Sequence, residues 1–101
     1  MSLSTTTQVY HLKDLREYIL SGKADFPNDY TLVANVDDTI TDLEKIFELT
    51  NNIEHNWGLN RGVYSLFLKN RSTSVGDVIV KAGVAYIVEN MGFKELPVSV
   101  L

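Results

Sequence analysis

The chain of 101 residues has no cysteine, only two prolines, and no apolar run of the roughly 20 residues that cross a bilayer. Without cysteine there is no disulfide and no thiolate chemistry, so a metal ligand would have to be histidine or carboxylate. Residues 1–8 are polar and lack the charged and apolar regions of a secretion signal. These absences favour a cytoplasmic protein without a membrane association.

A strong excess of basic charge is also missing, since the net charge is −4. Residues 1–57 hold four basic and ten acidic side chains, and residues 58–101 hold five basic and three acidic ones. Nucleic-acid binders usually carry a larger basic excess. We therefore expect no strong nucleic-acid binding, although the basic C-terminal half keeps open a small nucleic-acid or nucleotide-phosphate binding domain.

Runs of β-branched residues predict the strands. Tyr30 to Val36 reads as a strand inside a sheet, and residues 8–12 as the start of another. Val78–Val80 and Val84–Val88 are separated by a short glycine-containing connection, which predicts an antiparallel hairpin. A third strand follows at residues 93–96. Residues 58–70 fit either a strand or a short helix.

Two helices are predicted from apolar spacing. Leu12, Leu15 and Ile19 repeat at helical spacing before the stop signal at Gly22. Thr41 and Glu44 form a capping box that predicts a second helix start, with a buried stripe at Leu43, Ile46, Phe47 and Ile53. We expect one α+β domain over residues 1–101, with residues 1–7 disordered: a mixed or antiparallel sheet of four to five strands with two helices packed on one face.

The stretch from Ser72 to Leu96 carries a resemblance. It reads S-x-S-x-G-D, then a β run, then Ala-Tyr-Ile-Val and a closing Gly-Phe-x-x-Leu. With the preceding helix from Asp42, it resembles the YodL-like domain of plasmid, phage and other mobile-element proteins over residues 42–96. The chain departs from that pattern in residues 57–70 and at Glu89-Asn90. The resemblance implies a mobile-element context but no reaction and no catalytic residues.

The sequence offers few candidate sites for catalysis or metal binding. The motif from Leu32 to Thr39 is similar to the first motif of haloacid-dehalogenase-type phosphatases, but Asn35 stands where the nucleophilic carboxylate would be. A minimal hydrolase using Asp37 and Asp38 is therefore the least favoured hypothesis. The acidic group around the second helix start is better explained as capping than as a metal site. The two histidines, His11 and His55, form no recognisable ligand pair, and we predict no metal, cofactor or catalytic residue.

Two groups of residues remain as candidate binding sites. The hydroxyl-rich turn, which could cradle a phosphate with backbone N–H groups or be a plain β-turn, consists of Ser72, Thr73, Ser74 and Gly76. The predicted interaction surface, of residue types common at binding hot spots, consists of Trp57, Arg61, Tyr64 and Arg71. Core packing is the alternative for Trp57. The sequence thus predicts a non-enzymatic protein-interaction module of mobile-element origin, a monomer or weak homodimer with a protein partner.

Overall fold

A computed structural model describes residues 7–37, 40, 42–51, 62–67 and 71–96. Two helices, α1 (Leu15–Ser21) and α2 (Leu43–Leu49), accompany a single sheet in an α+β fold. The six strands of this sheet are β1 (Thr7–Leu12), β2 (Tyr30–Val36), β3 (Val63–Ser65), β4 (Val78–Lys81), β5 (Val84–Glu89) and β6 (Gly92–Glu95). No helix in the described ranges is long and apolar enough to cross a membrane.

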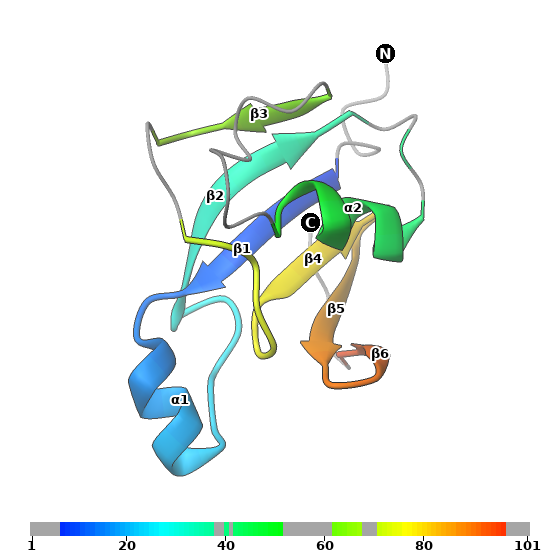
Figure 1. Cartoon of the computed structure of the whole chain (residues 1–101). Coiled ribbons are helices and arrows are strands. Elements are labelled where there is room, and N and C mark those ends of the chain that lie inside the picture. The colour runs from blue at the N-terminus through cyan, green and yellow to red at the C-terminus, as the bar shows by residue number, and fades with distance from the viewer. Residues whose placement is uncertain (1–6, 38–39, 41, 52–61, 68–70, 97–101) are drawn as a thin grey trace.

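The strands lie in the order β3-β2-β1-β4-β5-β6, and every neighbouring pair is antiparallel (Figure 1). The sheet is therefore larger than the four to five strands expected from the sequence. β1 lies inside it, between β2 and β4, where the sequence indicated the start of a strand at residues 8–12. Residues 1–6 lie outside the described part, and Thr7 already belongs to β1.

The hairpin of β4 and β5 confirms the prediction made from the two β-branched runs. Lys81 pairs with Val84, and the turn between them has positive φ at both Ala82 (52°) and Gly83 (79°). Two consecutive left-handed residues match the right-handed twist of the flanking strands. β6 then pairs with β5 after the turn at Asn90-Met91, where a third strand was predicted.

A β-bulge in β2 explains why this strand buries neighbouring residues. Val9 pairs with Ala34 while Tyr10 pairs with Leu32, so Val33 is an extra residue on β2. A bulge of this kind interrupts the strict alternation of side chains. Val33, Ala34 and Val36 are consequently all buried in one cluster with Val9, Ile79 and Val88.

Helix α2 covers that first cluster and lies across β1 and β4 in Figure 1. Ile46 is fully buried, and Leu43, Phe47 and Leu49 pack against the cluster; Ile53 lies outside the described residues. The predicted N-cap Thr41 is wrong, because Asp42 is the N-cap and its Oδ1 accepts a hydrogen bond from the Glu44 N–H at 3.0 Å. A carboxylate that reaches the N2 amide of the helix removes the need for the threonine hydroxyl.

Helix α1 differs more from the expectation. It starts after Asp14, ends at Gly22 in the predicted left-handed conformation (φ 71°), and has no buried residue. Leu15 and Tyr18 pack against a second cluster, which includes Leu12, Phe26, Tyr30, Val78, Val80 and Ala85. The two helices therefore do not share one cluster on one face. Ile19, expected on the buried stripe, is 72% exposed, because Leu12 belongs to β1 and α1 projects from the end of the sheet (Figure 1).

Candidate functional site

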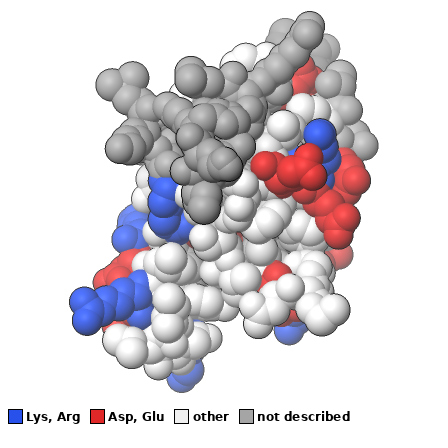
Figure 2. Space-filling view, viewed as in Figure 1, with Lys and Arg blue, Asp and Glu red and all other residues white. Residues whose placement is uncertain are grey.

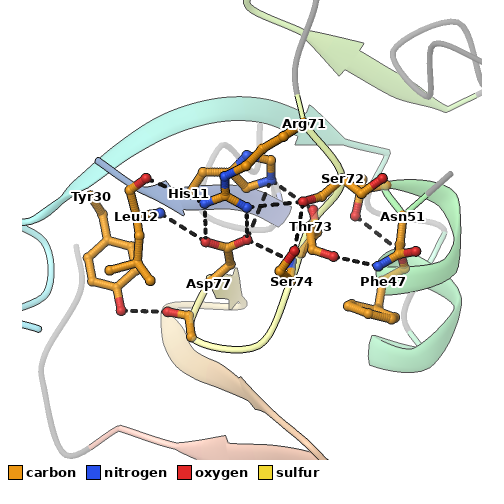
Figure 3. Close-up of polar contacts among 12 residues, drawn as sticks. His11, Leu12, Tyr30, Phe47, Asn51, Arg71, Ser72, Thr73, Ser74 and Asp77 are labelled. Carbon is orange, nitrogen blue, oxygen red and sulfur yellow. Dashed lines mark hydrogen bonds and ion pairs between the residues drawn. The ribbon is translucent and has the colours of Figure 1, made fainter. Parts of the chain in front are cut away.

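The structure describes two of the four residues of the predicted interaction surface. Trp57 and Arg61 lie outside the described residues. Tyr64 is on β3 and is 60% exposed. Arg71 points inward and forms an ion pair with Asp77 (Figure 3). Arg71, whose side chain is 34% exposed, thus has a structural contact, and its place on a partner surface stays a prediction.

Asp77 is the centre of a buried polar network and has no exposed surface. The Arg71 guanidinium donates to both carboxylate oxygens, from Nη1 to Oδ2 at 2.6 Å and from Nη2 to Oδ1 at 2.8 Å. The backbone N–H of Leu12 donates to Oδ1 at 2.9 Å, and that of Ser74 to Oδ2 at 2.7 Å. Four charge-assisted or amide hydrogen bonds therefore compensate the loss of hydration of this carboxylate.

His11 joins the same network from β1. Its Nε2 lies 2.9 Å from the Thr73 Oγ1 and 3.9 Å from the Asp77 Oδ2. Burial lowers the pKa of His11 to about 4; the Asp77 charge opposes this shift and the Arg71 charge adds to it. The imidazole is therefore neutral at physiological pH, and it contributes hydrogen bonding to the network without charge.

The network also holds helix α2 to the loop before β4. The Thr73 N–H donates to the Thr50 carbonyl at 2.8 Å, and the Asn51 Nδ2 donates to the Thr73 carbonyl at 2.5 Å. Thr50 is the C-cap residue of α2. The end of α2 is thus fixed to the same loop that encloses Asp77 (Figure 3).

The hydroxyl-rich turn uses its hydrogen-bond donors inside the protein. Among its N–H groups, that of Thr73 binds Thr50, that of Ser74 binds Asp77, and that of Gly76 donates to the Val88 carbonyl at 2.9 Å. The Ser72 carbonyl accepts from Arg71 and from the Ser74 hydroxyl. Three of its N–H groups are thus engaged within the protein, and the one that contacts an anion, that of Ser74, donates to the Asp77 carboxylate.

Asp77, His11 and Thr73 lie close together, as the members of a catalytic triad would. In such a triad the acid and the nucleophile contact opposite nitrogens of the imidazole. Here Thr73 Oγ1 and Asp77 Oδ2 both lie nearest the same atom, Nε2, and Thr73 has no exposed surface. The arrangement fits a role in stability better than nucleophilic attack on a substrate.

Exposed apolar side chains occur instead on β3, one of the two edge strands of the sheet, and just after it. Tyr64, Leu66 and Phe67 are 60, 51 and 49% exposed, and we call these three residues the β3 edge. Their backbone is held in place, because the Leu66 N–H donates to the Val33 carbonyl at 2.9 Å and the Phe67 N–H donates to the Ser65 Oγ at 3.2 Å. Of the β3 edge, sequence reasoning selected only Tyr64; the apolar alternation over residues 63–68 was the signal that could have indicated the others.

Comparisons with protein-family models, with curated proteins and with solved structures found no match to this chain. The resemblance of residues 42–96 to the YodL-like domain therefore stays a prediction.

Proposed function

We propose that this chain is a non-enzymatic protein-interaction module that binds an apolar surface of a partner protein through the β3 edge. The observation that carries the proposal is the exposure of Tyr64, Leu66 and Phe67 on a backbone held by β2. Aromatic side chains on a fixed backbone provide contact area at a low cost in conformational entropy.

The chemistry of the β3 edge favours a protein over a nucleic acid. Residues 62–67 carry no charge, and phosphate binding depends on cationic groups. Arg71, the one described cation of the predicted surface, is engaged with Asp77. The alternative, a nucleic-acid or nucleotide-phosphate binding domain, would have to obtain its positive charge elsewhere.

Two further parts of the proposal rest on the sequence. A mobile-element origin follows from the resemblance to the YodL-like domain alone. A cytoplasmic place of action is consistent with the absence of cysteine, and the proposed oligomeric state is a monomer or weak homodimer.

The test compares two double variants in affinity purification from the native host. Tyr64→Ser with Phe67→Ser removes the aromatic groups of the β3 edge, and Ile19→Ser with Leu20→Ser removes aliphatic groups of α1 that are even more exposed. Proteins captured by the wild type are then purified and titrated calorimetrically against all three forms. We expect the first variant to weaken binding by at least about tenfold and the α1 variant to leave it unchanged.

Three results would contradict the proposal. One is a captured partner that binds the β3-edge variant as well as it binds the wild type. Another is an equal loss of affinity in both variants when circular dichroism shows both to be folded. The third is binding of random duplex DNA in the micromolar range at physiological salt, which would support the nucleic-acid alternative.

A further inference from the structure

A groove of about 500 Å³ lies between helix α2 and the hairpin of β5 and β6. It is on a different part of the molecule from the β3 edge and shares no residue with it. The residues that line it are Glu44, Phe47, Glu48, Asn51, Val75, Val88, Glu89, Asn90, Gly92 and Phe93.

The floor of the groove is apolar and well supported. The rings of Phe47 and Phe93 meet edge to face, with centroids 6.4 Å apart and planes at 73°. Both rings pack against the first core cluster, which includes Val88. Val75 is 39% exposed at one side. Such a floor suits an aliphatic or aromatic side chain, because the groove offers apolar contact without rearrangement of the core.

The rim of the groove is acidic. Glu44, Glu48 and Glu89 are exposed, and no described lining residue is basic. Figure 2 shows acidic side chains gathered where α2 lies, next to uncharged surface. One cation is close, since Lys45 Nζ lies 3.0 Å from Glu48 Oε1, but both side chains are more than half exposed. An exposed pair of this kind is weak and can exchange for a cation on a ligand.

We propose that this groove binds a cationic segment of a partner protein, in which an aliphatic or aromatic side chain sits on the Phe47–Phe93 floor and flanking arginine or lysine side chains pair with the rim. Arginine suits the site because its guanidinium pairs with carboxylates and also stacks on aromatic rings. Nucleic acids are disfavoured by the negative rim. A second copy of this chain is disfavoured because each copy has a net charge of −4.

The proposal rests on the proposed function in that the ligand is a polypeptide, but it names another surface and a ligand of defined charge. The probe is a phage-displayed library of short random peptides, selected on the immobilised full chain. We expect the enriched peptides to combine arginine or lysine with leucine or an aromatic residue, and to bind less tightly as salt is raised.

Charge variants test the location of the enriched peptides by fluorescence polarisation. Glu44→Gln with Glu89→Gln removes two rim charges, and Glu17→Gln with Glu95→Gln removes two exposed charges that do not line the groove. We expect the rim variant to weaken binding about fivefold and the control to change it little. Val75→Lys, which places a cation beside the apolar floor, should abolish binding.

The proposal is overturned if no peptide is enriched, if the enriched peptides lack basic residues, or if both charge variants lose affinity equally. The variant Tyr64→Ser with Phe67→Ser separates the two proposals. It should bind the peptides as the wild type does. If it does not, the peptides occupy the β3 edge; the groove proposal then fails while the proposed function stands.

Discussion

Replacing Arg71 by glutamine should test whether the Asp77 network stabilises the fold. Asp77 is fully buried, and Arg71 donates two of the four hydrogen bonds described above for its carboxylate. Removing one partner of a buried ion pair typically costs about 3–5 kcal/mol, because it leaves an uncompensated charge. The Arg71 side chain is 34% exposed, and the N–H groups of Leu12 and Ser74 remain on Asp77. We therefore expect the free energy of unfolding to fall by about 2–3 kcal/mol, at or just below the lower end of that range.

A double-mutant cycle with Asp77→Asn isolates the ion pair from the rest of the network. The asparagine amide nitrogen cannot accept a hydrogen bond, so the Asp77→Asn variant should lose about 1–2 kcal/mol by itself. Once Asp77 is neutral, Arg71→Gln leaves no buried charge behind. The double variant should then be more stable than the sum of the single losses predicts, by at least about 1 kcal/mol.

Urea unfolding followed by far-ultraviolet circular dichroism measures these differences. Lys45→Gln is the matched control, since it breaks the exposed ion pair with Glu48 and should cost less than about 1 kcal/mol. A loss for Arg71→Gln no greater than that of the control would refute the reasoning. So would additive losses in the double variant, because they would show that the charges of Arg71 and Asp77 are not coupled.

Three further changes test other parts of the structure by the same unfolding assay. The pKa of His11 is about 4 in the folded protein against an ordinary 6.5, so protons favour the unfolded state as the pH falls through that range. Between about pH 7.5 and 5 the free energy of unfolding of the wild type should therefore fall by about 2 kcal/mol more than that of His11→Gln, and parallel pH curves for the two proteins would contradict this. Asp42→Ala should cost about 1 kcal/mol through loss of the α2 N-cap, and an unchanged midpoint would argue against that cap. Gly76→Ala should cost clearly more stability than Gly22→Ala, for which we expect about 1 kcal/mol. A Cβ at Gly76 would come within 2.7 Å of the Tyr18 ring, whereas a Cβ at Gly22 meets no atom within 4 Å, so equal losses would contradict the close packing at Gly76.

Strands β2, β4 and β5 were the most predictable part of the fold, because the signal for each of them is local. The bounds of β2 coincide with the predicted run from Tyr30 to Val36, and the β4–β5 hairpin follows from two β-branched runs with a glycine-containing turn. The two-residue turn sets the register of that hairpin. The pairing of β1 with β4 was not predicted, because nothing near either strand in the sequence specifies a partner so far along the chain.

The helix details depended on choices that the sequence leaves open. Thr41 and Asp42 are both good capping residues, and only the position of the carboxylate shows that Asp42 performs this role. For the first helix, the apolar spacing of Leu12, Leu15 and Ile19 correctly indicated a helix in this part of the chain. The chain nevertheless stays in β1 up to Leu12, so that the helix starts one turn later and leaves Ile19 exposed.

For the candidate site, too, the residue types alone did not show which group the hydroxyl-rich loop binds. Residue types alone identified a loop able to bind an anion, with Arg71 at its start. Identifying the anion required the antiparallel pairing of β1 with β4, in which Tyr10 lies opposite Val78. That register brings the Leu12 N–H and the His11 ring beside Asp77, which follows them by more than sixty residues. An arginine and a hydroxyl-rich turn that would suggest a phosphate site in isolation therefore stabilise the fold here. The surfaces that we propose for a partner are instead the uncharged β3 edge and the acidic groove.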